Sequence, residues 1–164
     1  MHDACGVVGI SLNETANGAA KSIYYSLYAL QHRGQEAAGI SVHDGKSIRT
    51  HRAMGLVSEV FDDAQIALLR GHVGIGHVRY ATSGRSCIEN SQPLLVKYKD
   101  GAIATAHNGN LVNSTQLREQ LEEAGDIFYS TSDTEVIAHI FVKELLHYDL
   151  LEAARSLMRR IVGS

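Results

Sequence analysis

The chain has 164 residues, of which 45% are hydrophobic and 20% are charged, and its formal net charge is −3 at pH 7. This length suffices for one domain with a core of its own, so neither a disulfide nor a metal is needed to stabilise it. The slightly acidic balance, without a basic cluster, argues against a nucleic acid or a membrane surface as partner. Because no cationic leader and no apolar run of about 20 residues is present, we expect a cytoplasmic protein.

The cysteines and histidines limit the redox and metal chemistry to be expected. The only cysteines are Cys5 and Cys87. In a cytosolic protein we expect them to be reactive or buried thiols rather than a disulfide. Nine histidines are scattered along the chain without a paired ligand spacing. The sequence therefore predicts no metal site.

The first part of the chain has the pattern of a strand followed by a helix. An apolar run bounded by glycines predicts a strand over residues 6–12. From Ala19 onward, apolar residues recur every three or four positions and predict a helix. We expect this helix to end near Gly34, because glycine readily adopts the left-handed conformation of a helix C-cap.

Two hairpins and one further strand are predicted next. Asp-Gly pairs are strong hairpin signals, and they lie between the strand pairs 37–42 with 47–52 and 94–98 with 102–106. Between the hairpins, a short helix is expected over 64–69 and a strand over 73–80. Gly74 and Gly76 on one face of that strand indicate that a bulky side chain or another backbone packs closely there.

The remainder of the chain predicts helices. Asn113 with Gln116, and Ser132 with Glu135, have the spacing of capping boxes, in which two residues bond each other's backbone. Apolar stripes behind both pairs, and a third over residues 150–161, predict three helices. Strands precede most of the helices and form antiparallel hairpins, which indicates an α+β protein with helices laid over sheets.

Cys5 lies almost at the start of the sequence, just before the first predicted strand. A thiol is a strong nucleophile only as the thiolate, and a cysteine at a mature N-terminus has a base in its own α-amine, whose pKa is about 8. For Cys5 this requires that residues 1–4 are removed as a propeptide. The alternative is a small buried hydrophobic residue at the start of a strand.

Four polar segments contain more side-chain chemistry than a core requires: 31–35, 76–82, 107–110 and 130–135. Each has an ordinary explanation, as a helix-terminal cation, a strand-end surface charge, a turn, or an acidic residue in a first helical turn. Together with a thiolate they also suit attack on the side-chain amide of an amino acid. Asn108 beside Gly109 can stabilise an oxyanion, while Arg79 can bind a carboxylate and Asp133 an ammonium group.

Five motifs in order resemble the glutaminase domain of the glutamine phosphoribosylpyrophosphate amidotransferase (amidophosphoribosyltransferase) family: CGVVGI at 5–10, LQHRGQEAAGI at 30–40, GHVRY at 76–80, HNGN at 107–110 and SDTE at 132–135. They are spread over the whole chain. The resemblance implies an N-terminal-nucleophile (Ntn) hydrolase with a four-layer αββα sandwich of antiparallel sheets. It also implies glutamine as substrate and the first committed step of purine synthesis, which forms 5-phosphoribosylamine, as the activity.

The resemblance assigns the catalytic chemistry to three residues. Cys5 is the nucleophile, its freed amine is the base, and Asn108 with Gly109 forms the oxyanion hole. While residues 1–4 remain attached, Cys5 has no free amine and should be a poor glutaminase. Cys87 is the rival thiol, and a Cys–His pair centred there would indicate a different class of hydrolase, but no histidine lies near it in the sequence.

The resemblance assigns substrate binding to four further residues. Arg79, with help from Thr82, binds the glutamine carboxylate, and Asp133 binds the glutamine amino group. Arg33 matches an arginine near the family's active site, and its role is the least defined. A non-catalytic glutamine-binding module would keep Arg79 and Asp133 without ever exposing a reactive Cys5.

A relative with the same chemistry, glucosamine-6-phosphate synthase, is the alternative within the superfamily. It usually has tyrosine-arginine-glycine-tyrosine where this sequence has His-Arg-Gly-Gln at 32–35, and tryptophan where this sequence has Tyr80. No tryptophan occurs in the chain. Asparagine synthetase diverges further, so the purine enzyme is the better match.

In the family, the glutaminase domain runs several tens of residues further and a phosphoribosyltransferase domain follows. Residues 5–164 are therefore expected to be an incomplete type II glutamine amidotransferase domain, truncated at its C-terminus. We expect no cofactor within it. Phosphoribosylpyrophosphate with Mg²⁺ belongs to the missing domain, the full-length protein is expected to be a homo-oligomer, and some relatives carry an iron–sulfur cluster.

Overall fold

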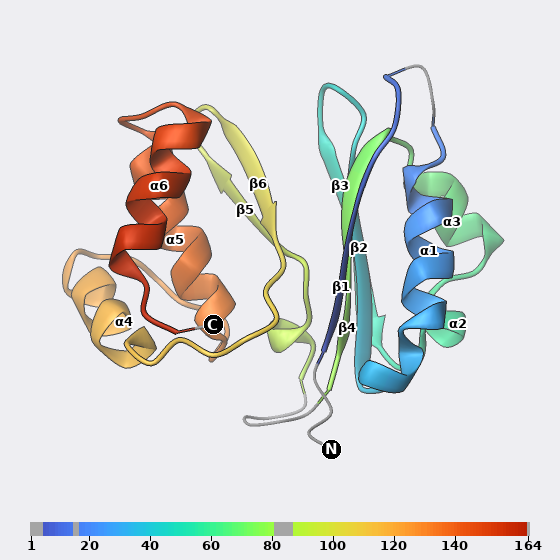
Figure 1. Ribbon diagram of the computed structural model, residues 1–164, viewed down its shortest axis with the longest axis horizontal. Helices are drawn as coiled ribbons and strands as arrows, with labels where there is room; N and C mark the ends of the chain where they lie inside the picture. The colour runs from blue at the N-terminus through green and yellow to red at the C-terminus, as the bar shows by residue number, and fades with distance from the viewer. Residues whose placement is uncertain (1–4, 15–16, 81–86, 164) are drawn as a thin grey trace.

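The structure is a computed structural model that describes residues 5–14, 17–80 and 87–163. These residues form four layers, with helices outside and two antiparallel sheets inside (Figure 1). The predicted α+β class and αββα sandwich are thereby confirmed. Among the helices of the described residues, none is both long enough and apolar enough to span a bilayer.

The larger sheet contains four strands in the order β1-β4-β2-β3, all paired antiparallel. These strands are β1 (Gly6–Ser11), β4 (Val73–Arg79), β2 (Ala37–His43) and β3 (Ile48–Met54). Three helices cover its outer face in Figure 1: α1 (Ala19–Ala29), α2 (Val57–Val60) and α3 (Asp63–Leu68). The central strand β2 is buried along almost all of its length, as expected for a strand covered on both faces.

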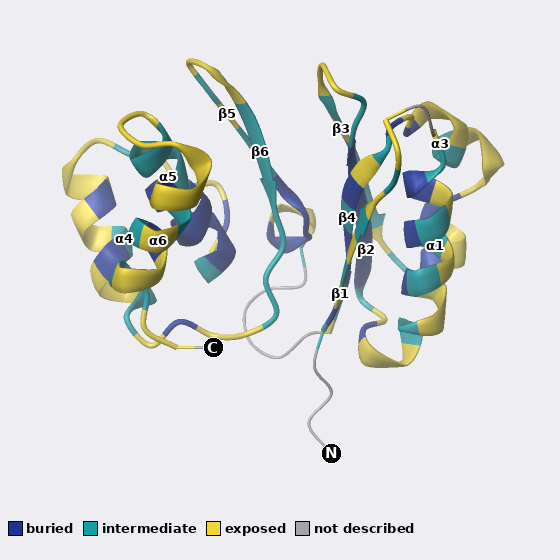
Figure 2. Cartoon of the chain, turned by 45° about the horizontal axis from the view of Figure 1, so that its top comes forward, coloured by how far each residue is buried: buried dark blue, intermediate teal, exposed yellow. Residues whose placement is uncertain are grey.

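Helix α1 packs tightly on the larger sheet through one apolar face. Its Ile23 and Leu27 are completely buried, and Figure 2 shows the buried side of α1 turned toward the strands. A Cβ at Gly76 of β4 would overlap the side chains of both residues. The close packing predicted from the glycines of this strand is therefore confirmed at Gly76.

The end of α1 differs from the prediction. The helix stops at Ala29, a short 3₁₀ helix η1 (Gln31–Arg33) follows, and Gly34 is extended, with φ −159° and ψ 126°. Glycine is needed there because a Cβ would lie 2.7 Å from the backbone carbonyl carbons of Val78 and Arg79. The close approach of η1 to the end of β4 places Arg33 beside the start of β1.

The second sheet consists of the predicted hairpin β5 (Leu94–Tyr98) and β6 (Gly101–Thr105). A 3₁₀ helix, η2 (Ile88–Asn90), precedes it. Three helices form the outer layer on this side: α4 (Ser114–Glu123), α5 (Asp133–Leu145) and α6 (Leu150–Arg160). A second apolar core joins these helices, with Val136 and Ile140 of α5 completely buried.

Neither predicted capping box forms. The side chain of Asn113, at the start of α4, instead donates to the Arg160 carbonyl at 2.9 Å and accepts from the Val162 N–H at 2.9 Å. Ser132 does cap α5, with its Oγ accepting from the Thr134 N–H at 3.2 Å. The Glu135 carboxylate, however, bonds to the loop before the helix rather than to the backbone of Ser132.

Candidate active site

A cavity of about 740 Å³ lies where the polar segments of the sequence meet. It is lined by six of the seven residues that the resemblance selected, namely Cys5, Arg33, Arg79, Asn108, Gly109 and Asp133. The seventh residue, Thr82, and the predicted propeptide 1–4 lie outside the described residues. A second cavity, of about 490 Å³, lies between the β2–β3 and β5–β6 hairpins and contains none of these residues.

Cys5 occupies the end of the cavity that is closest to the larger sheet. Because Gly6 pairs with Val78, the residue before it lies beside the end of β4. The Tyr80 N–H points at the Cys5 Sγ, with a nitrogen–sulfur distance of 3.3 Å. Cys5 is only partly buried and lines the cavity, so it is not a core residue, whereas Cys87 does not line it. Both thiols are free.

The backbone carbonyl of Cys5 is held from both sides of the cavity. Arg33 donates to it through Nε at 3.2 Å, and Asn108 donates through Nδ2 at 2.6 Å. Arg33 follows α1 on the side of the larger sheet, and Asn108 follows β6 of the smaller sheet. The two donors therefore fix the backbone of Cys5 relative to both sheets.

Asn108 lies against a buried histidine that had no predicted role. His77, on β4, has no solvent exposure. Burial lowers its pKa to about 4, although its contact with the Asn108 side chain favours the protonated ring. At neutral pH the ring behind the asparagine is therefore uncharged.

His77 should make the stability of the fold depend on pH. The unfolded chain binds a proton at a pKa near the ordinary 6.5, but the folded chain does so only near 4. We expect the free energy of unfolding to fall by up to about 3 kcal/mol between pH 6.5 and 4, and to be fully retained above this range. Urea denaturation from pH 7.5 to 4.5 measures this slope, and His77→Gln should flatten it. An equal slope in both proteins would contradict the assignment.

Arg79 lies at the end of a strand, where a charged side chain could have been exposed on the surface, but it is largely buried. Its Nη1 forms an ion pair with Glu36 Oε1 at 3.1 Å, and both side chains are 11% exposed. Glu36 precedes β2, the strand paired with β4, and its N–H donates to the Arg79 carbonyl at 3.0 Å. Glu36 thus orients the guanidinium while leaving other N–H groups free to face the cavity.

Asp133 is both the first residue of α5 and a wall of the cavity. Its Oδ2 accepts from the Leu111 N–H at 2.9 Å, and its Oδ1 lies 3.7 Å from His107 Nδ1. Burial works against the charged form, but the interactions with His107 and the Leu111 N–H outweigh it and lower the pKa of Asp133. The side chain is therefore an anion at neutral pH, as binding of an ammonium group requires.

Two neutral residues of the cavity wall, Asn90 and Gln92, had no predicted role. Gln92 Oε1 accepts from the His107 N–H at 2.7 Å and so fixes the loop that contains Asn108. Asn90 forms hydrogen bonds with Thr131 on the opposite loop. Within the described part of the chain, no group of three or more His, Cys, Asp or Glu residues is arranged to hold a metal ion.

The cavity thus brings a thiol together with an amide donor, a cation and an anion, and comparison with known proteins identifies the family. The family model for the glutamine amidotransferase domain matches residues 52–148, more than half of the chain. The chain belongs to this family.

Two similar proteins and one solved structure carry the name of the same enzyme. Amidophosphoribosyltransferases from Methanothermobacter thermautotrophicus and Bacillus subtilis are 51% and 45% identical over the whole chain, which covers 35% and 34% of their length. A solved glutamine phosphoribosylpyrophosphate amidotransferase from B. subtilis, complexed with ADP and GMP, matches 96% of the chain at 44% identity with a TM-score of 0.85. The chain covers 33% of that structure, so it spans about a third of these relatives.

Proposed function

We propose that this chain is the glutaminase part of an amidophosphoribosyltransferase. In this proposal it hydrolyses glutamine through a Cys5 thioester and supplies ammonia to phosphoribosylpyrophosphate, which yields 5-phosphoribosylamine for purine synthesis. The observation that carries the proposal is the single cavity in which a thiol, an amide donor, an arginine and an aspartate meet. The names of the relatives support the choice of the purine enzyme over the aminosugar synthase.

The charged groups of the cavity bind the two charged groups of glutamine. Arg79 pairs with the α-carboxylate, and its contact with Glu36 holds the guanidinium in place. Asp133 pairs with the α-ammonium group. With both ends of the amino acid fixed, the side-chain amide is directed toward Cys5, and this orientation contributes to the rate of attack.

The chemistry proceeds by acyl transfer to sulfur. The α-amine of Cys5 takes the thiol proton, and Sγ attacks the amide carbon to give a tetrahedral oxyanion. Asn108 Nδ2 has two N–H groups, so one can hold the Cys5 carbonyl while the other, together with the Gly109 N–H, donates to the oxyanion. Collapse breaks the C–N bond, the amine returns its proton to the departing ammonia, and water then hydrolyses the thioester to glutamate and the free thiol.

This mechanism requires that residues 1–4 are absent from the active form. While they remain attached, the Cys5 nitrogen is an amide and cannot accept a proton near neutral pH. Mass spectrometry of the N-terminus together with a glutaminase assay tests this requirement. Full activity in a protein that keeps Met1 would contradict the proposed base.

Asp133→Asn should weaken glutamine binding rather than chemistry. It removes the charge that pairs with the substrate ammonium group while keeping an oxygen for the Leu111 N–H. We expect the KM for glutamine to rise about 100-fold and kcat to change less than about threefold. Steady-state glutamate formation measures both. The matched control is Asp63→Asn at the exposed first residue of α3, and a change in kcat alone would contradict the role.

The acceptor half of the reaction is assigned to the part of the relatives that this chain does not match. We expect phosphoribosylpyrophosphate with Mg²⁺ to bind there, in a homo-oligomeric protein that, as in some relatives, holds an iron–sulfur cluster. Two free thiols fit the proposed cytoplasmic location. Supplying the full-length protein with phosphoribosylpyrophosphate or fructose-6-phosphate tests the acceptor, and use of the sugar phosphate would overturn the assignment.

A further inference from the structure

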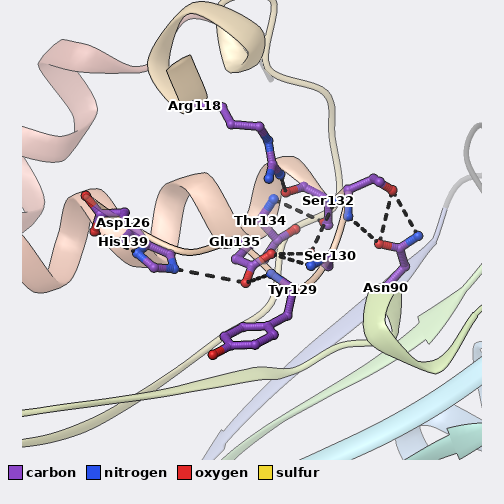
Figure 3. Close-up of polar contacts among 10 residues, drawn as sticks. Asn90, Arg118, Asp126, Tyr129, Ser130, Ser132, Thr134, Glu135 and His139 are labelled. Carbon is purple, nitrogen blue, oxygen red and sulfur yellow. Dashed lines mark hydrogen bonds and ion pairs between the residues drawn. The ribbon is translucent and has the colours of Figure 1, made fainter. Parts of the chain in front are cut away.

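The loop that leads into α5 forms one wall of the cavity, and a buried carboxylate organises it. Thr131 and Ser132 of this loop line the cavity beside Asp133. Glu135, on the first turn of α5, is 7% exposed and turns back toward the loop (Figure 3). Its carboxylate accepts from the Tyr129 N–H at 3.0 Å, the Ser130 N–H at 2.7 Å and the Ser130 hydroxyl at 2.6 Å.

These hydrogen bonds continue to the residue before Asp133. Ser130 Oγ accepts from the Ser132 N–H at 3.2 Å, and Ser132 Oγ accepts from the Thr134 N–H at 3.2 Å. The path from Glu135 through Ser130 to Ser132 therefore fixes the backbone on both sides of Asp133. Glu135 acts on Asp133 only through the backbone and through neighbouring side chains.

Two further side chains hold the same loop, one from α4 and one from the wall of the cavity. Arg118 of α4 donates to the Ser132 carbonyl at 3.0 Å. Asn90 accepts from the Thr131 N–H at 3.0 Å and donates to Thr131 Oγ1 at 3.1 Å. These contacts hold residues 131 and 132, but neither supplies acceptors for the N–H groups of residues 129 and 130. The Glu135 carboxylate accepts both of these hydrogen bonds.

We propose that Glu135 is a positioning residue that holds Asp133 ready for the substrate's ammonium group, and that it thereby sets the preference for substrates that carry an α-amino group. The inference rests on the proposed function. The loop donors face both carboxylate oxygens, so a neutral amide at this position turns an NH₂ group toward a backbone N–H. Glu135→Gln keeps the size of the side chain but introduces this mismatch, and the loop with Asp133 must shift.

The test compares glutamine with 4-carbamoylbutanoate, which lacks only the α-amino group. For Glu135→Gln in the mature full-length protein, we expect the KM for glutamine to rise about tenfold with kcat within about threefold. The kcat/KM for 4-carbamoylbutanoate should change less than about twofold. The control is Glu144→Gln on the same helix, whose carboxylate pairs with Arg160 at 2.9 Å and lies outside the cavity.

A double-mutant cycle separates positioning from a general structural effect. In the Asp133→Asn background, Glu135→Gln should change the KM for glutamine by less than about twofold, because the group that it positions is already gone. An equal loss of kcat/KM for both substrates would overturn the inference. So would additive effects of the two substitutions on the KM for glutamine. If Glu135→Gln does not fold, Ser130→Ala removes one link of the path. It should raise the KM for glutamine by a smaller factor and leave the kcat/KM for 4-carbamoylbutanoate unchanged.

Failure of this inference is distinguishable from failure of the proposed function. If the wild-type protein does not hydrolyse glutamine, or does not prefer it to 4-carbamoylbutanoate, the proposed function is wrong. If it shows this preference and Glu135→Gln retains the preference unchanged, only the role of Glu135 is wrong.

Discussion

Cys5→Ala should lower the rate of glutamine hydrolysis by about 10⁴-fold or more. A thioester needs a thiol, and among the described residues that line the cavity Cys5 is the only cysteine. Binding should survive, because Arg79 and Asp133 are unchanged, and the Kd for glutamine should stay within a few-fold. Stopped glutamate assays and isothermal calorimetry measure the two effects.

The matched control is Cys87→Ser, which should leave hydrolysis within about twofold of wild type. Loss of activity in the Cys87 variant, with activity kept in Cys5→Ala, would show that the other thiol is the nucleophile. A wild-type protein that binds glutamine without hydrolysing it, even with Cys5 at its N-terminus, would instead indicate a non-catalytic module.

Asn108→Ala should lower kcat by about 10²- to 10³-fold and leave the KM for glutamine nearly unchanged. The amide donates in the transition state, where negative charge develops on the oxygen, and removal of one such donor has an effect of this size. The same substitution also releases the Cys5 carbonyl, to which Asn108 donates at 2.6 Å. Steady-state kinetics at saturating glutamine measures the loss.

Asn17→Ala, at an exposed position shortly before α1, is the control for this prediction and should behave as wild type. A KM effect with unchanged kcat in Asn108→Ala would mean that the side chain binds ground-state glutamine rather than the oxyanion. The stability of the variant should be checked, since Asn108 contacts the buried His77.

The layered fold was predictable because its signals are local. Alternation and helical spacing identify the strands and helices, and the Asp-Gly pairs identify both hairpins. Two of the errors came from contacts that are distant in sequence. Gly34 is extended because the end of β4 packs against it. Asn113 does not cap its own helix because its side chain bonds to the backbone at the end of α6.

Residues of the candidate site could be predicted from the sequence only where they belong to short, recognisable motifs. Cys5, Asn108 and Asp133 belong to such motifs, and the structure brings them to one cavity. Glu36 and Asn90 support the site through partners 43 and 41 residues away, and no sequence spacing identifies such pairs. Glu36 lies within the motif at 30–40, but no role was predicted for it.

The most direct test of Cys5 as the nucleophile is the intact mass of the purified protein after reaction with an electrophilic glutamine analogue that alkylates thiols. We predict loss of residues 1–4 and a single adduct, which peptide mapping places on Cys5 and which excess glutamine prevents. An adduct on Cys87, or an intact Cys5 in a folded protein that has lost residues 1–4, would contradict this prediction.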